Sequence, residues 1–140
     1  MLRKKLIERE IEKRDFKRGG EVSSKLKSIL RKLGVNADII RKASIITYEL
    51  EMNIIIHSEG GNITAFISGE NIEICADDRG PGIEDLEQAF QPGFSTAEDE
   101  IRELGFGAGM GLNNIKKYSD KMDMDSSLEE GTTVNITLNV

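Results

Sequence analysis

The chain has 140 residues, of which 38% are hydrophobic and 31% charged, and its formal net charge is −6 at pH 7. This length and composition predict one globular domain, and the single cysteine excludes an internal disulfide and favours a reducing cytoplasm. The N-terminus has charges without an apolar segment behind them, and polar residues interrupt the longest apolar stretch, so we expect neither a signal peptide nor a membrane span.

The charge is distributed unevenly along the chain. Residues 1–42 contain 14 Lys and Arg against 6 Asp and Glu, whereas residues 43–140 contain 5 against 19. Phe16 is the only aromatic residue of the basic part, so a base-stacking surface is missing and we do not expect direct nucleic-acid binding. A docking face for an acidic protein and a plain solvated helix face both remain open.

Hydrophobic periodicity predicts the secondary structure in chain order. Residues 5–16 suit an edge strand, residues 19–34 suit a helix that Gly34 ends, and residues 37–57 suit a second, more buried helix. A hairpin is expected over 62–78, a short helix near 84–90, a loop at 91–107, a helix over 109–120 and a second hairpin over 121–140. This order predicts an α+β fold of two layers, with the helices on one face of a mostly antiparallel sheet.

Two polar residues interrupt the buried helix. Glu49 and Asn53 are four positions apart, so their side chains lie on the same helix face. A buried carboxylate and amide need partners, because unsatisfied they cost several kcal/mol. A hydrogen-bonded core pair is one interpretation, and a proton-handling Glu beside an Asn that ligates a hard cation is the other.

The strands place two further polar residues at the edge of the core. Ile72, Ile74 and Ala76 share a strand face with Asp78, which the turn sequence RGPG follows. In the last strand, the inward row is Thr132, Val134, Ile136, Leu138 and Val140. We therefore expect Asp78 and Thr132 at the mouth of the core, where glycines let a flat ligand approach.

The glycine-rich segment GFGAGMGL, residues 105–112, matches neither of the common phosphate-binding loops. The third glycine of a dinucleotide-binding fingerprint would fall on Met110, and no lysine follows as in a P-loop. What remains is a loop whose backbone N–H groups lead into a helix N-terminus, which is a ready anion site.

Taken together, ELEMN (49–53), DRGPG (78–82), GFGAGMGL (105–112) and GTTV (131–134) resemble the boxes of the GHKL (Bergerat-fold) ATP-binding family. The chain is most similar to the anti-sigma-factor serine/threonine kinases, and its DRGPGI, GFST and lid sequences look more like the switch kinase RsbT than like RsbW or SpoIIAB. The resemblance implies one ATP-binding kinase domain over residues 1–140, with an ATP lid at about 91–111.

The resemblance also implies roles for particular residues. Glu49 corresponds to the general base, Asn53 to the Mg²⁺ ligand, Asp78 to the acceptor from the adenine amine, and Thr132 to a water-mediated partner of that contact. Arg102 in the lid is a candidate for the γ-phosphate, with a solvated lid arginine as the equal alternative. The implied ATP-binding set is completed by Gly80, Gly82, Gly105, Gly107, Ala108, Gly109, Met110 and Gly111.

Three functions follow from this likeness. The first is a kinase that uses ATP and Mg²⁺ to phosphorylate a STAS-domain antagonist protein in a partner-switching pathway. The second is an anti-sigma factor that chiefly holds a sigma factor, and the third is a noncatalytic ATP-binding module; homodimerisation is open in each. Glu51 departs from the pattern as an extra acid, which we expect to face the partner.

Overall fold

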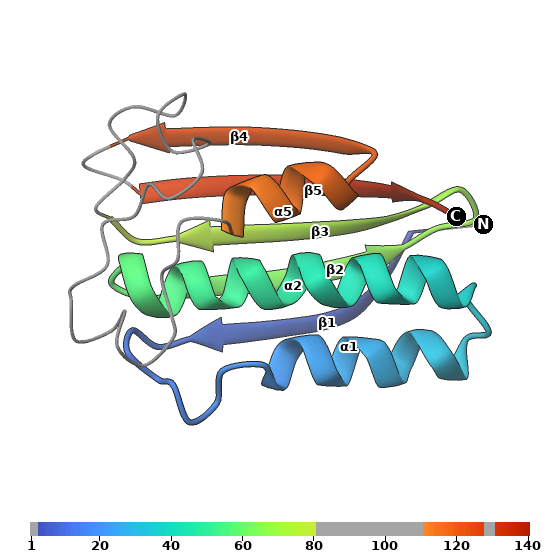
Figure 1. Cartoon of the computed structure of the whole chain (residues 1–140), viewed down its shortest axis with the longest axis horizontal. Coiled ribbons are helices and arrows are strands. Elements are labelled where there is room, and N and C mark those ends of the chain that lie inside the picture. The colour runs from blue at the N-terminus through green and yellow to red at the C-terminus, as the bar shows by residue number, and fades with distance from the viewer. Residues whose placement is uncertain (1–2, 81–110, 128–130) are drawn as a thin grey trace.

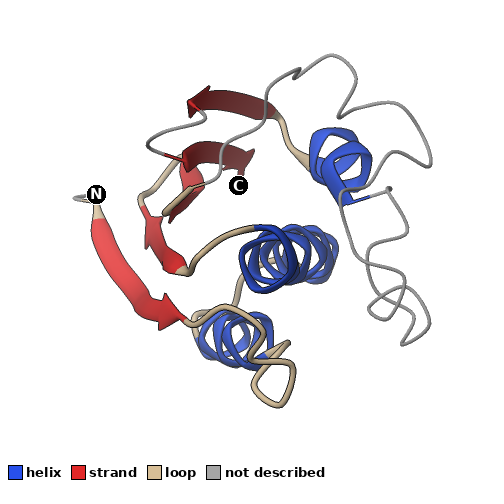
Figure 2. Ribbon diagram, turned by 90° about the vertical axis from the view of Figure 1, so that its left-hand side faces the viewer, coloured by secondary structure: helices blue, strands red, loops and turns tan. Residues whose placement is uncertain are grey.

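In a computed structural model of the chain, residues 3–80, 111–127 and 131–140 are described. Five strands form one sheet in the order β1-β2-β3-β5-β4, and each neighbouring pair is antiparallel. Figures 1 and 2 show the three helices together on one face of this sheet, as the sequence predicted. The elements are β1 Lys4–Ile11, α1 Glu21–Lys32, α2 Ala37–His57, β2 Gly61–Ile67, β3 Asn71–Asp78, α5 Gly111–Tyr118, β4 Lys121–Ser127 and β5 Gly131–Asn139.

The long helix α2 has the bounds that its sequence predicts. The Asn36 side chain accepts a hydrogen bond from the backbone N–H of Asp38 at 2.9 Å, which satisfies one of the unpaired donors at the helix start. At the other end, Ser58 takes an extended conformation and its hydroxyl donates to the carbonyl of Ile54 at 2.7 Å. Both ends are therefore set by local capping.

The helix α1 ends as expected but begins without a cap of its own. Gly34, with a φ of 75°, follows the last turn, and its N–H donates to the carbonyl of Arg31 at 3.1 Å. At the start, Gly20 is left-handed with a φ of 93° and offers no side chain to the helix. The free N–H groups there must find an acceptor elsewhere in the fold.

The core lies between the helix layer and the inward face of the sheet. Isoleucine dominates it, and Ile63, Ile72 and Ile74 are fully buried on adjacent strands. In β5 the predicted inward row holds from Thr132 to Leu138, but Val140 is 52% exposed because the strand ends one residue earlier. The alternation in β3 carries Asp78 to the rim of this core, where it is partly exposed.

The helix predicted near 84–90 and the loop at 91–107 lie outside the described residues, while the helix predicted over 109–120 is present as α5. Within the described ranges, no helix is both long and apolar enough to cross a membrane.

Candidate functional site

Glu49 and Asn53 lie on a partly exposed stripe of the second half of α2. Both are partly exposed, whereas Leu50, Met52 and Ile54 between and beside them are buried in the core. The sequence predicted a buried pair, whereas the structure places both side chains at the edge of the core, where each is partly exposed. Because these polar groups are partly exposed, a ligand can contact them without any rearrangement of the core.

The helix α5 packs against α2 and supplies a partner to this stripe. The side-chain amide of Asn114 donates to Oε1 of Glu49 at 3.5 Å, and the next residue, Ile115, is fully buried and fixes the helix against the core. Partial burial raises the pKa of Glu49, and the Asn114 contact opposes that rise. Asn114 was not assigned a role from the sequence, because only the packing of two distant helices brings it to Glu49.

Glu51 does not face a partner, contrary to the prediction. Its side chain is only 1% exposed and lies beneath α1, where Oε2 accepts from the backbone N–H of Val22 at 3.5 Å. Burial raises the pKa of this carboxyl, and the N–H groups of Val22, Ser23 and Gly20 oppose the rise. Glu51 of α2 therefore caps the start of α1, which has no capping side chain of its own. Its second oxygen, Oε1, has no hydrogen-bond partner among the described residues.

Asp78, at the end of β3, is held by the start of β5. Its Oδ1 accepts from the backbone N–H of Thr132 at 2.8 Å. Burial is the main cause that raises the pKa of Asp78, with the nearby Asp77 charge adding to it and the Thr132 N–H opposing it. Thr132 is 6% exposed and shares a 2.8 Å hydrogen bond with the hydroxyl of Ser126. The backbone of Thr132 thus contacts Asp78 directly, and the water-mediated role implied for the Thr132 side chain stays a prediction.

Two glycines leave no room for side chains around Asp78. A Cβ on Gly131, whose φ is 105°, would lie 2.7 Å from both Oδ1 of Asp78 and the backbone nitrogen of Gly80. On the other side, a Cβ on Gly61 would lie 2.8 Å from the Cα of Asp78. The backbones of β2 and β5 therefore pack closely against Asp78 of β3. Its Oδ1 accepts from the Thr132 N–H, and Oδ2 is the acceptor that this N–H does not use. Gly61 was missed by the sequence analysis, since its role depends on strand pairing.

The candidate site residues of the described part lie toward one end of the molecule. Figure 1 shows the end of β3, the start of β5, the start of α5 and the last turns of α2 together at that end. Gly80 follows β3 and accepts from the N–H of Glu59, and Gly111 is the first residue of α5. The remaining predicted site residues lie outside the described residues: Gly82, Arg102, Gly105, Gly107, Ala108, Gly109 and Met110.

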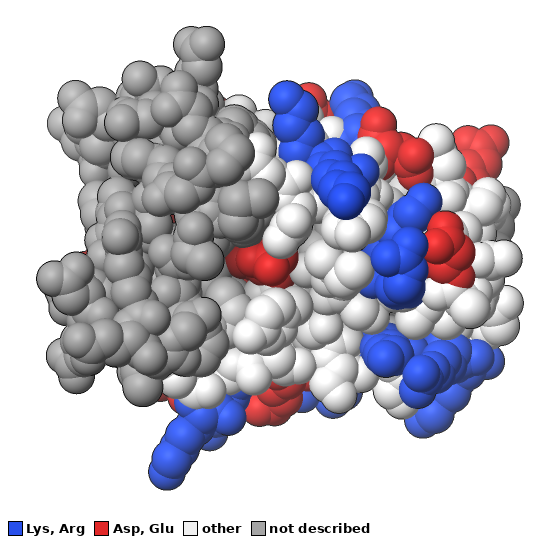
Figure 3. Space-filling model, viewed as in Figure 1, with Lys and Arg blue, Asp and Glu red and all other residues white. Residues whose placement is uncertain are grey.

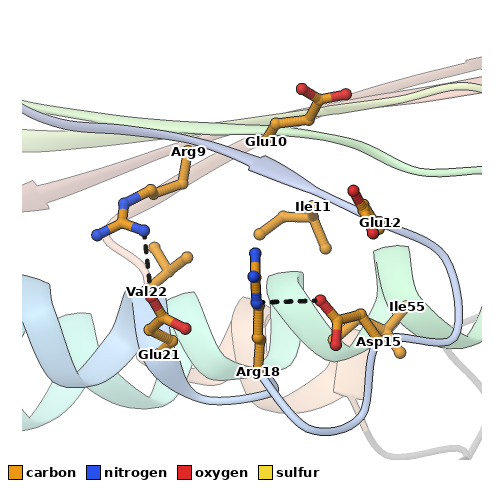
Figure 4. Close-up of a pocket in the computed structure, with 9 residues that line it drawn as sticks. All are labelled: Arg9, Glu10, Ile11, Glu12, Asp15, Arg18, Glu21, Val22 and Ile55. Carbon is orange, nitrogen blue, oxygen red and sulfur yellow. Dashed lines mark hydrogen bonds and ion pairs between the residues drawn. The ribbon is translucent and has the colours of Figure 1, made fainter.

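A separate hollow lies away from these residues, between β1, α1 and the segment that joins them. Figure 4 shows this cavity of about 170 Å³, lined by Arg9, Glu10, Ile11, Glu12, Asp15, Arg18, Glu21, Val22 and Ile55. Its arginines already have acid partners, Arg9 with Glu21 at 3.1 Å and Arg18 with Asp15 at 3.8 Å. None of the predicted site residues lines it.

The described residues at this end of the molecule offer groups that can contact a nucleotide. A carboxylate oxygen beside a glycine-lined strand end can accept from the amino group of a flat base, and the acid–amide pair on α2 opens at the same end. Among the residues that the structure describes, no group of three His, Cys, Asp or Glu side chains could hold a metal ion. A cation here would take ligands such as the Asn53 amide oxygen together with phosphate oxygens, as Mg²⁺ often does.

The chain is a two-layer α+β domain in which helices cover one face of an antiparallel sheet, and an architecture of this kind does not by itself fix a function. Residues 38–140 match the family model described as "Histidine kinase-, DNA gyrase B-, and HSP90-like ATPase", and the chain belongs to this ATP-binding family. The family predicted from the sequence motifs is thereby confirmed.

Several similar proteins bear the name "Anti-sigma F factor". One from Thermoanaerobacter sp. (strain X514) is 42% identical over 94 residues, covering 64% of this chain and 62% of the relative. One from Caldanaerobacter subterraneus subsp. tengcongensis is 35% identical over 101 residues, covering 72% and 63%. One from Bacillus subtilis (strain 168) is 30% identical over 116 residues, covering 79% and 76%.

The match thus spans 62% of the length of the relative from Thermoanaerobacter sp. and more of the Bacillus one. These names agree with the predicted anti-sigma-factor group. The narrower prediction, a switch kinase like RsbT, is not tested by them and stays a prediction.

Proposed function

We propose that this protein binds Mg·ATP and transfers the γ-phosphoryl group to a serine of a STAS-domain antagonist protein in a partner-switching pathway. The observation that carries the proposal is the pair Glu49 and Asn53, four residues apart on a partly exposed stripe of α2, whose last turns lie at the same end of the molecule as the end of β3 and the start of β5. The family supports ATP as the cofactor, and the names of the relatives support a sigma-factor pathway.

ATP would supply the phosphoryl group, and Mg²⁺, which the Asn53 amide oxygen would help to hold, would neutralise charge on its phosphates. The residues of the chain bind and orient the nucleotide and accept one proton. Asp78 accepts a hydrogen bond from the base, which fixes the nucleotide at the strand end. Glu49 takes the proton of the partner's serine hydroxyl as that oxygen attacks the γ-phosphorus and ADP leaves. Because phosphoryl transfer requires mainly positioning and charge stabilisation, this small set of groups is sufficient.

The state of Glu49 suits a general base. Partial burial raises the pKa of Glu49, so this carboxylate binds a proton more readily than an exposed one does. The Asn114 contact limits the rise and holds one oxygen, while the other oxygen has no hydrogen bond to any residue in the described part of the chain and can meet the incoming hydroxyl.

A second function is favoured by the names of the relatives. In that case the protein acts chiefly by holding a sigma factor, and the bound nucleotide sets the affinity of that complex. The same site then serves as a nucleotide sensor, and Glu49 is not needed as a base.

One experiment separates the two functions. The purified chain is mixed with labelled Mg·ATP and either the cognate STAS-domain antagonist or the cognate sigma factor, and phosphoserine formation and complex formation are both measured. Phosphate on the antagonist supports the kinase. A tight, nucleotide-dependent sigma complex without any phosphoryl transfer supports sequestration and excludes the kinase function.

A further inference from the structure

Three helix ends meet at the end of the helix layer opposite the candidate site. The last turns of α1 and α5 and the first turns of α2 lie there, and the Arg41 guanidinium is 5.6 Å from the ring centroid of Tyr118, the last residue of α5. The cations on these ends, together with Lys27 one turn earlier in α1, form what we call the basic helix-end surface: Lys27, Arg31, Lys32, Arg41, Lys42, Lys116 and Lys117. Figure 3 shows most of the blue side chains of this face gathered away from the grey region.

Helix stability alone does not explain this surface. Cations in the last turn of a helix are favoured by the helix dipole, which accounts for those at the ends of α1 and α5. Arg41 and Lys42 lie in the first two turns of α2, where the dipole does not favour them. Their one acidic neighbour, Asp38, lies 2.9 Å from Arg41 and 3.3 Å from Lys42. The surface therefore holds more positive charge than the fold requires.

Much of this charge is available to a partner. In the described part of the chain, Lys27, Arg31 and Lys32 are exposed and take part in no ion pair. Asp120, which follows α5, accepts from the backbone of Asn139 at 2.7 Å and so turns toward the sheet. An acidic surface is the complement of such a patch.

The chemistry of the patch favours a protein over a nucleic acid. Leu33 is 50% exposed among these cations, and an apolar anchor ringed by charge is typical of protein interfaces. Tyr118 is engaged by Arg41 and by Lys117, at 5.3 Å, so it does not offer a free stacking face to a base.

The patch and the candidate site share a helix face. Lys42 and Glu49 are seven residues apart, which is about two turns, so they lie on the same side of α2 and about 10 Å apart along it. A protein seated on the patch can therefore reach the partly exposed stripe with an adjoining segment.

We propose that the basic helix-end surface docks an acidic face of the phosphoacceptor protein and so presents that protein's serine to the site on α2. The identity of the occupant rests on the proposed function, whereas the docking itself does not require catalysis. The surface thus acts as a specificity element that recognises the partner by charge and a single apolar contact.

The test compares two triple variants with the same change in net charge. One carries Lys27→Glu, Arg31→Glu and Lys117→Glu in the surface, and the other carries Lys4→Glu, Lys17→Glu and Lys121→Glu elsewhere. Binding of the cognate STAS-domain antagonist is measured by calorimetry, and the KM for the antagonist is measured in the transfer assay. We expect the surface variant to bind the antagonist about tenfold or more weakly and to show a KM for the antagonist raised by about the same factor. The control variant should change each quantity by less than about threefold, and the two variants should keep the wild-type Kd for ATP.

Equal losses in the two variants, or no loss in either, overturn the proposal, as does a wild-type protein that does not bind the antagonist. A surface variant that binds the antagonist normally but loses affinity for a duplex DNA fragment or an anionic phosphatidylserine vesicle also overturns it, in favour of a polyanion. If the wild type binds the antagonist in a charge-dependent way but transfers no phosphate, the docking surface stands and the kinase function fails.

Discussion

Gly131 is the residue whose change should most clearly separate the site from the rest of the fold. Replacing it with alanine places a Cβ 2.7 Å from Oδ1 of Asp78, the atom that accepts from the Thr132 N–H, and the new carbon also meets the backbone carbonyl of Asp78. The chain offers a matched control in Gly34, which is also left-handed, with a φ of 75°, but has nothing within 4 Å of its Cβ position.

The magnitudes follow from these two surroundings. A left-handed alanine costs roughly 1–2 kcal/mol through its own backbone clash, and both variants bear this cost. Gly131→Ala also forces a carbon into filled space, and such overpacking typically costs a further ~1–3 kcal/mol. Since the carboxylate must move to relieve the contact, the variant should also lose at least about tenfold in ATP affinity, the size expected for one hydrogen bond to a buried polar group.

Urea unfolding gives the two stability changes, and calorimetric titration with Mg·ATP gives the affinities. We expect Gly34→Ala to be slightly less stable than the wild type and to bind ATP equally well. Gly131→Ala should lose clearly more stability and should bind ATP much more weakly. Equal losses of stability in the two variants, or an unchanged ATP affinity in Gly131→Ala, would refute the assignment of the closely packed Asp78 carboxylate as the group that accepts from the adenine amine.

Three further predictions concern single side chains. Asp78→Asn should weaken ATP binding by about tenfold, since it replaces an acceptor oxygen with a donor at one of two positions; calorimetry showing no change would contradict it. Asn114→Ala should slow phosphoryl transfer without changing the Kd for ATP, and in a Glu49→Gln background it should have no further effect; additive losses would show that Asn114 does not act through Glu49. Glu51→Gln should gain stability relative to the wild type as pH rises. The folded-state pKa of Glu51 is raised, so its contribution is fully present below the unfolded value of about 4.3 and is lost as pH rises through the folded value. Urea unfolding at pH 4 and pH 7.5 measures this, and a difference that stays constant or reverses with pH would count against it.

The sequence was sufficient wherever local signals determine structure. The bounds of α2 follow from the Asn36 cap and an apolar run, and the end of α1 follows from Gly34. The alternation in β3 placed Asp78 at the rim of the core because strand periodicity is rigid. Four separated motifs identified the ATP-binding family, which the family model then confirmed.

The errors lie where one element depends on another. From the sequence, Glu51 was expected to be an exposed acid. It is buried because the start of α1 has no capping side chain of its own and its backbone N–H groups hydrogen-bond to Glu51. Asn114 and Gly61 gain their roles from helix packing and strand register, which a single sequence does not encode locally. Val140 follows the inward alternation of its strand, yet it is exposed because the strand has already ended.

The central claim, that Glu49 is the base of a phosphoryl transfer, is tested most directly by single-turnover transfer of labelled phosphate to the cognate antagonist. Glu49→Gln keeps the size of the side chain and its helix but cannot take a proton, so ATP should bind with the wild-type Kd while transfer slows by about 10² or more. Asn53→Ala should instead lose Mg²⁺-dependent ATP binding and transfer together. A Glu49→Gln protein that phosphorylates the antagonist at the wild-type rate would contradict the account.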